Sequence, residues 1–149
     1  MSVINHFAAA DGYDVLLAMQ SGELPQADVT RYLGLELQTV ERGHVVYAMT
    51  PRADLYNLIG SVHGGIVTTL LDTALGTSVQ SLLPPGKVAT TMDLHTRFHR
   101  PVTTAVARVF ADARAVHVGK RTATSEARLI DADGKIYATA TSTLMIIEA

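Results

Sequence analysis

Cysteine is absent from the 149-residue sequence. Its absence excludes disulfide bonds, thiolate nucleophiles and cysteine-ligated zinc. A strong excess of one charge is also missing, because 12 Lys and Arg against 14 Asp and Glu leave a formal net charge of −2. Such a chain has no global basic field that would recruit nucleic acid or a membrane surface. We therefore expect neither of these partners.

Long apolar runs are lacking too. No segment is long enough to cross a bilayer, and the first twenty residues do not show the basic start and apolar run of a signal peptide. The composition, 48% hydrophobic and 17% charged, is typical of a compact globular chain. We expect a single domain in the cytoplasm, where a chain without cysteine suits reducing conditions.

The order of predicted elements points to one fold class. Residues 11–20 predict a short helix, and residues 31–51 contain two β-rich runs that form a hairpin. One long helix is predicted from Gly64 or Gly65 to about Leu83, where the Pro84-Pro85-Gly86 run stops it. Four β-rich runs follow. The chain is therefore predicted to be α+β, with an antiparallel sheet and a central helix on one of its faces.

The first of these four runs alternates in character. Its even-numbered residues point one way and its odd-numbered residues the other. The even set is Met92, Leu94, Thr96 and Phe98, and the odd set is Asp93, His95, Arg97 and His99. The histidines do not have the spacing of a zinc site, so no metal is expected.

The long predicted helix carries a single acid, Asp72. Between Ala53 and Lys87 there is no Lys, Arg or Glu. The helical face of Asp72 also carries Gly65, Thr68, Thr69, Leu75, Gly76 and Val79. The opposite side, which is predicted to face the core, carries Val67, Leu70, Leu71 and Ala74. An isolated acid on a helix often just faces water. A solvent-facing helix of this length, however, normally carries several charges, so we expect this face to be covered by a ligand or a second subunit.

The start of this helix, His63-Gly64-Gly65, offers backbone amides that have no partner within the helix. Such amides can stabilise a carbonyl oxygen that gains negative charge, although a glycine pair can also serve a tight turn alone. Gly64 and Asp72 are eight residues apart, which is about 12 Å along a helix. One carbonyl cannot reach both groups in one chain, but two antiparallel copies of the helix would bring them together.

These residues resemble a known family. The stretch "NLIGSVHGGIVTTLLDTALG", with its Asn, His-Gly-Gly and an Asp eight residues after the first Gly of the pair, is similar to hotdog-fold acyl-CoA thioesterases of the PaaI (phenylacetate-degradation) type. "TTMDLHTRFHRPV" and the closing three-strand segment also look like that family. The resemblance covers roughly residues 30–147. It implies a single hotdog domain over residues 1–149, with a helical extension at 1–30 and the hotdog core at 31–149.

The resemblance also implies roles for individual residues. Asp72 would be the nucleophile or the general base, and the Gly64 amide would polarise the thioester carbonyl. Asn57 would help to position that carbonyl or the carboxylate, and His63 would support the loop and the thioester end. Thr91 would orient the water, although the adjacent Thr90 could serve instead.

Further residues are implied for substrate binding, and no separate cofactor is needed because coenzyme A is part of the substrate. Gly65 would lie against the substrate, and Lys120 and Arg121 would hold the CoA phosphates. Arg97 and Arg100 are secondary candidates for these phosphates, and any of the four cations could instead be a solvated surface charge.

The resemblance implies a homodimer with shared active sites, in which dimers could pair further into a homotetramer. Two other functions stay open. One is an acyl-thioester dehydratase or hydratase, which would need a catalytic histidine paired with an acid. The other is a non-catalytic acyl-CoA-binding protein of the same fold. The preferred acyl group stays open between aromatic and medium-chain aliphatic.

Overall fold

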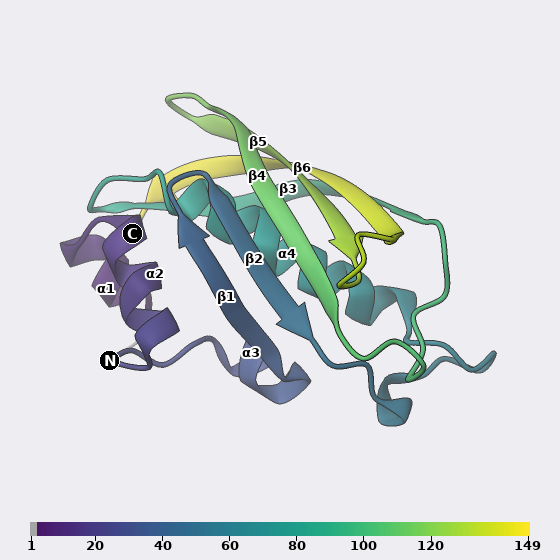
Figure 1. The fold of residues 1–149 in the computed structure, drawn as a ribbon. Helices are drawn as coiled ribbons and strands as arrows, with labels where there is room; N and C mark the ends of the chain where they lie inside the picture. The colour runs from purple at the N-terminus through teal and green to yellow at the C-terminus, as the bar shows by residue number, and fades with distance from the viewer. Residues whose placement is uncertain (1–2) are drawn as a thin grey trace.

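One antiparallel sheet and one long helix dominate the computed structural model, which describes residues 3–149 (Figure 1). Helix α4 (Gly64–Gln80) lies across one face of the sheet, whose strand order is β1-β2-β4-β5-β6-β3. This is the arrangement that the hotdog resemblance predicts. The strands are β1 (Leu35–Glu41), β2 (His44–Met49), β3 (Lys87–Phe98), β4 (Val109–Val118), β5 (Thr122–Ile130) and β6 (Ile136–Glu148).

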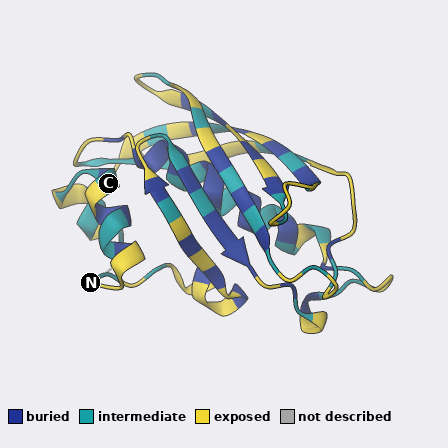
Figure 2. Ribbon diagram, viewed as in Figure 1, coloured by how far each residue is buried: buried dark blue, intermediate teal, exposed yellow. Residues whose placement is uncertain are grey.

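The core lies between α4 and the sheet. Alternate strand residues point toward α4, as the pleat of a strand requires, and Val109, Ala111 and Ala113 of β4 are fully buried there. Figure 2 shows the same alternation of buried and more exposed residues along the strands. Small residues on the sheet let the helix approach closely, and Leu70 and Leu71 of α4 fill the space between the layers.

The two faces of α4 differ as predicted, with one correction. Val67, Leu70, Leu71 and Ala74 are buried against the sheet. Leu75 and Val79 were expected on the open face but are fully buried as well, because Leu75 belongs to the main core and Val79 packs with Ala123 of β5 and Leu144 of β6. The open face is therefore narrower, and it carries Asp72 between Gly65, Thr69 and Gly76.

Strand β3 is an edge strand, since it pairs with β6 on one side and with no described strand on the other. Its register shifts between Thr91 and Asp93. One extra residue, Met92, stands at this bulge, and an extra residue reverses the faces of the strand on either side of it. As a result Thr91 faces α4 together with Leu94 and Thr96, although its residue number has the opposite parity.

Three short helices precede the sheet, of which the sequence predicted only one. The predicted helix is α2 (Gly12–Ser21), with Asp11 as its N-cap residue accepting a hydrogen bond from the Tyr13 amide. Helices α1 (Val3–Ala9) and α3 (Asp28–Leu33) were not expected, because neither is long enough to show a helical period. A single turn of 3-10 helix, η1 (Ala53–Leu55), follows β2.

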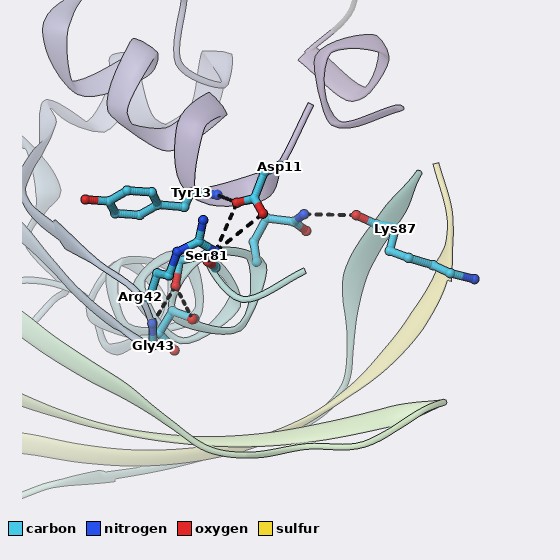
Figure 3. Close-up of polar contacts among 8 residues, drawn as sticks. Asp11, Tyr13, Arg42, Gly43, Ser81 and Lys87 are labelled. Atoms are coloured by element: carbon cyan, nitrogen blue, oxygen red, sulfur yellow. Dashed lines mark hydrogen bonds and ion pairs between the residues drawn. The ribbon is translucent and has the colours of Figure 1, made fainter. Parts of the chain in front are cut away.

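Helix α2 docks on the C-terminal end of α4 and α1 packs on α2, whereas α3 packs on β1. The Gly12 amide donates to the Leu83 carbonyl at 3.0 Å. Figure 3 shows Arg42 between Asp11 and Ser81, with its guanidinium 3.2 Å from Asp11 Oδ1 and over the ring of Tyr13. Helix α2 thus lies at the opposite end of α4 from Gly64. Across residues 3–149, no helix is both long and apolar enough to span a membrane.

Candidate active site

The side chains of Asp72 and Thr91 meet on the open face of α4. The Thr91 hydroxyl donates to Asp72 Oδ1 at 2.8 Å. Asp72 is half-buried, and the structure gives it no ion pair with any cation among residues 3–149. One carboxylate oxygen is thus held by a hydroxyl, while the other stays available for a substrate or a water molecule.

The two threonines that the sequence could not separate differ in the structure. Thr91 pairs in register with Leu144, which faces α4, whereas Thr90 pairs with Met145 on the outer face of the sheet. Only Thr91 is therefore placed to contact Asp72. Its role as the group that orients water stays a prediction.

The threonines on α4 do not compete for the carboxylate. Thr69 Oγ1 donates to the Gly65 carbonyl at 2.8 Å, and Thr73 Oγ1 donates to the Thr69 carbonyl at 2.8 Å. Because both hydroxyls bond carbonyls of the preceding helical turn, they do not bond the carboxylate of Asp72. The hydroxyls of Thr69 and Thr73 are consequently not available to the Asp72 carboxylate.

The first turn of α4 exposes one amide. His63 is the N-cap residue, and its Nδ1 accepts a hydrogen bond from the Gly65 amide at 3.0 Å. Within residues 3–149 the Gly64 amide has no protein acceptor. His63 therefore occupies the second amide and leaves the first one for a ligand, which agrees with the predicted roles of His63 and Gly64 without testing them.

Asn57 shapes the loop before α4. Its side-chain oxygen accepts hydrogen bonds from the amides of Ile59 and Ser61, and its side-chain nitrogen donates to the Ser61 hydroxyl. Both ends of the Asn57 amide thus hold the loop. Tyr56 anchors the same loop to Thr104: its phenol hydroxyl donates to Thr104 Oγ1 and accepts from the Thr104 amide, and these hydrogen bonds with Thr104 lower the pKa of Tyr56.

A hollow of about 380 Å³ lies beside Gly64. We call it the Gly64 hollow. Asn57 and Arg100 border it, and Tyr137 lies in its wall with a pKa raised by burial and by the neighbouring Asp131 carboxylate. Phe98 covers Gly64, and the sequence analysis did not predict this ring as a site residue. The lining is formed by Asn57, Ser61, Val62, Gly64, Val67, Phe98, His99, Arg100, Pro101, Val102 and Tyr137.

Two of the predicted cations lie near the Asp72–Thr91 pair. Lys120 and Arg121 are exposed in the β4–β5 turn. The Arg121 carbonyl accepts from the Ile146 amide, and Ile146 is the register partner of Ala89, two residues before Thr91. Strand β6 lies between β5 and β3, and neighbouring strands are about 4.8 Å apart. The β4–β5 turn therefore lies about 10 Å from β3, measured across the sheet at Ala89.

The other two cations lie elsewhere. Arg97 is on the outer face of the sheet, in a larger hollow of about 760 Å³ that includes neither Gly64 nor Asp72. Arg100 follows β3 and donates to the Ile136 carbonyl at the border of the Gly64 hollow. The structure therefore does not bring all four predicted cations together.

The predicted site thus forms two groups along α4. Gly64, Asn57 and Arg100 gather at the start of the helix, and Asp72 with Thr91 lies eight residues farther on, about 12 Å along the axis. Residues 3–149 contain no group of three or more metal-ligating side chains.

Comparison with known proteins identifies the family. The model of the thioesterase superfamily matches residues 59–138, more than half of the chain. This chain belongs to the thioesterase superfamily. The matched region includes the His-Gly-Gly run, Asp72, Thr91 and Arg100, whereas Asn57 lies two residues before it. Membership of this superfamily supports thioester hydrolysis as the chemistry of the chain.

Two relatives and one solved structure illustrate the similarity. A Halobacterium salinarum protein with a provisional esterase name is 41% identical over 73 residues, which cover 48% of this chain and 46% of that protein. This chain thus spans about half the length of that relative. A 1,4-dihydroxy-2-naphthoyl-CoA hydrolase of Listeria monocytogenes is 22% identical over 114 residues, covering 76% of this chain and 91% of that enzyme.

The structure of the E. coli PaaI protein from the phenylacetic acid degradation operon superposes with a TM-score of 0.79. The match covers 93% of this chain and 96% of PaaI at 23% identity. The two chains therefore share the hotdog fold, as the sequence resemblance predicted.

Proposed function

We propose that this chain hydrolyses an acyl-CoA thioester at a site shared by two protomers. The observation that carries the proposal is the separation of two reactive groups on one helix. The Gly64 amide is free of protein acceptors at the start of α4, and the Asp72 carboxylate lies about 12 Å farther along. Neither group is positioned to act with the other in the same chain.

A two-fold dimer would join these groups. One edge of strand β3 pairs with no strand among residues 3–149, and the face of α4 around Asp72 carries small residues that allow a second helix to approach. Two antiparallel copies of α4 would bring Gly64 of one protomer beside the partner's Asp72. The dimer would repeat this arrangement twice. Pairing of two such dimers into a tetramer remains part of the proposal.

The chemistry follows from these positions. The thioester oxygen accepts a hydrogen bond from the Gly64 amide, which stabilises the charge that develops on it. The partner's Asp72 either activates water as a general base or attacks the carbonyl carbon itself. The carbon–sulfur bond breaks, the leaving thiolate takes up a proton, and the oxygen of water ends in the free acid. Thr91 keeps the Asp72 carboxylate oriented toward the reaction.

Lys120 and Arg121 would hold the CoA phosphates, because they are exposed at the same end of the sheet as Asp72. Coenzyme A arrives as part of the substrate, and the steps above require no further cofactor. A chain without cysteine suits a reducing cytoplasm, which is the location that we propose.

A dehydratase or hydratase is less well supported. That chemistry would pair a histidine with an acid, and His63 uses Nδ1 to accept the Gly65 amide. No described carboxylate forms an ion pair with His63 in the chain. A non-catalytic acyl-CoA-binding protein would share the fold, and turnover separates it from an enzyme.

Hybrid dimers test the shared site. Asp72→Asn removes the carboxylate, and Gly64→Pro removes the amide hydrogen while proline remains acceptable at the first position of a helix. The proline Cβ would lie 3.2 Å from Phe98 Cζ, so this half-exposed ring must shift by a few tenths of an ångström. His63 already has the extended conformation that a following proline requires, with φ −56° and ψ 134°. Each variant alone should be inactive toward acyl-CoA.

Co-expression of the two variants should restore about a quarter of wild-type activity, since half of the randomly formed dimers are hybrids and each hybrid has one intact site. Free-thiol release from a panel of acyl-CoAs measures this recovery. A site built within one chain predicts no recovery, because no chain then carries both groups.

A further inference from the structure

We propose that β3 pairs in antiparallel fashion with the β3 strand of a second copy of this chain, in a register centred on His95. Asp93 of each protomer then lies opposite the partner's Arg97. The inference rests on the proposed function, because it uses the meeting of Gly64 with the partner's Asp72 to place the two-fold axis. It goes further in naming the residues at that axis and the charges that favour a second copy as the partner.

The two edges of the sheet differ in what covers them. Helices α2 and α3 pack on the edge strand β1, and Gln20 Nε2 of α2 donates to the Gln38 carbonyl of β1 at 2.8 Å. Elements of the same chain therefore cover the β1 edge, which leaves it little backbone for a partner strand.

The β3 edge is covered only where the strand begins. Gln80 at the end of α4 donates to the Lys87 carbonyl and accepts from the Ala89 amide. Helix α1 also contacts β3, and the Phe7 carbonyl of α1 accepts from the Gly86 amide just before the strand. Along residues 91–98, no strand among residues 3–149 pairs with this edge. An edge strand of this kind is a template for another strand.

The backbone of β3 after its bulge has a defined direction. Directly after the strand, the His99 amide donates to the Tyr137 carbonyl of β6 at 2.8 Å. Because this direction alternates along a strand, the odd-numbered residues from 93 to 97 direct their backbone groups toward β6. The even-numbered residues from 94 to 98 direct theirs to the open edge. A second β3 strand can therefore form backbone hydrogen bonds there, and odd-numbered residues would form the closer, non-hydrogen-bonded pairs.

Contacts between β3 and α4 place the two-fold axis along the strand. Phe98 lies over Gly64, and Thr91 bonds Asp72. When Gly64 lies beside the partner's Asp72, Phe98 comes close to the partner's Thr91. The axis then crosses β3 about midway between Thr91 and Phe98, which is at residues 94–96.

The exposed charges of β3 favour one register among these. Paired residues share a face of the sheet, so the axis falls on Leu94, His95 or Thr96 and not between two residues. Only the register centred on His95 sets a carboxylate opposite a guanidinium, because Asp93 then faces the partner's Arg97 twice. Both residues are exposed, and neither forms an ion pair within residues 3–149. Opposite charges directly across a strand pair stabilise it.

The same register covers exposed apolar surface. Met92 and Phe98 are each 54% exposed in the single chain. Each lies three residues from His95, so Phe98 of one protomer comes level with the partner's Met92. A methionine sulfur makes favourable contacts with an aromatic ring. A second copy of β3 therefore complements both the charges and the apolar side chains of this edge.

Exchange of the charges tests the register. Asp93→Arg would set two arginines opposite each other, and Arg97→Asp would set two aspartates opposite each other, so each variant alone should dimerise about tenfold more weakly than wild type. In a mixture of the two variants both charge pairs become attractive, so heterodimers should exceed the statistical proportion. Sedimentation equilibrium measures the first effect, and native mass spectrometry measures the second.

The matched control for this exchange is Arg128→Asp. Arg128 is exposed on the outer face of β5, away from the sheet edge, and its substitution should leave dimerisation unchanged. Equal dimerisation of all the variants, or a statistical mixture of Asp93→Arg with Arg97→Asp, overturns the register.

Cross-linking gives a second test that leaves Asp93 unchanged, which matters because Asp93 also accepts a hydrogen bond from the Thr143 amide. The chain has no cysteine, so His95→Cys introduces one thiol per protomer, at the proposed axis. The two Cα atoms would lie about 4.5 Å apart, within the range of a disulfide. Oxidation should therefore yield a covalent dimer on a non-reducing gel.

His99→Cys is the matched control for cross-linking. The register sets His99 opposite the partner's Thr91, so the two introduced thiols would be eight residues, or about 27 Å, apart along the strands. This variant should not cross-link. Cross-linking of both variants, or of neither, overturns the register.

The proposed function and the register can fail separately. If the wild-type protein hydrolyses no acyl-CoA but His95→Cys alone cross-links, the proposed function fails and the register stands. If the hybrid dimers of Asp72→Asn with Gly64→Pro recover activity but His95→Cys does not cross-link, the shared site stands and the register fails.

Discussion

The Thr91 hydroxyl donates to Asp72 Oδ1 across 2.8 Å, which joins the edge strand of the sheet to the open face of α4. The bond holds one oxygen of the carboxylate, and no donor among residues 3–149 bonds the second oxygen. Because Thr91 belongs to β3, any movement of this strand at its bulge would also move the proposed catalytic acid. The site therefore depends on the sheet edge as well as on the helix.

Replacement of Asp72 by Asn should lower kcat at least about 100-fold with little change in KM, the scale expected for loss of a principal acid–base or nucleophilic group. Asn keeps the size of the side chain and can still accept a hydrogen bond from Thr91. Steady-state release of free CoA provides the measurement, and circular dichroism checks the fold. Equal rates in the two proteins would exclude Asp72 from the reaction.

The adjacent threonines provide a matched pair. Thr91→Val removes the hydroxyl that contacts Asp72 but keeps a β-branched side chain, so kcat should fall about tenfold, in line with loss of one hydrogen bond to a charged group. Thr90→Val changes the outer face of the sheet and should leave kcat unaltered. A larger loss in Thr90→Val than in Thr91→Val would contradict the register described for β3.

Gly12 is expected to be essential for docking of the N-terminal helices. A Cβ at this position would lie 1.9 Å from the Gln80 carbonyl oxygen, and this backbone atom cannot move without disturbing the end of α4. Gly12→Ala should therefore lower the free energy of unfolding by about 3 kcal/mol. Urea denaturation measures the effect. An unchanged midpoint would show that α2 does not pack on α4 as described.

Alkaline pH should weaken the fold through Tyr47. Burial raises the pKa of Tyr47 from about 10 to about 12, so the folded state holds the phenol proton more tightly than the unfolded state does. Below pH 10 this difference in pKa contributes fully to the free energy of unfolding. The contribution, about 3 kcal/mol, is lost as the pH rises from 10 to 12. Urea midpoints at pH 9 and pH 11 should therefore differ less in Tyr47→Phe than in wild type.

Tyr32 supplies the control for this experiment, because its side chain is 81% exposed and is not part of the buried core. Tyr32→Phe should keep the wild-type difference between pH 9 and pH 11. If both substitutions reduce the difference equally, burial of Tyr47 is not its cause.

The sequence predicted the order of the main elements and the long helix because these follow from periodicity and from strong stop signals. Proline and glycine at 84–86 end α4 soon after Gln80, and the buried side chains of α4 recur at helical spacing. Helices α1 and α3 were missed, since seven and six residues are too few to establish a period and tertiary contacts decide their conformation.

The choice between Thr90 and Thr91 could not be made from the sequence. Plain alternation along β3 would place Thr90 on the same face as Leu94 and Thr96, and so would select the wrong residue. The bulge is invisible in a pattern of apolar and polar residues because Met92 fits either face. The position of Phe98 over Gly64 could not be predicted for a different reason. It brings together residues 34 positions apart and depends on the packing of β3 against α4.

The bulge at Met92 also determines which way Thr91 faces. Met92 is the one residue of this segment without a partner on β6, because Thr91 lies opposite Leu144 and Asp93 opposite Thr143. Deleting Met92 alone would therefore remove the bulge and leave Thr91 facing α4, together with Leu94 and Thr96. Pairing Met92 into a regular ladder would instead turn Thr91 to the outer face and separate its hydroxyl from the carboxylate, although neither residue would be altered.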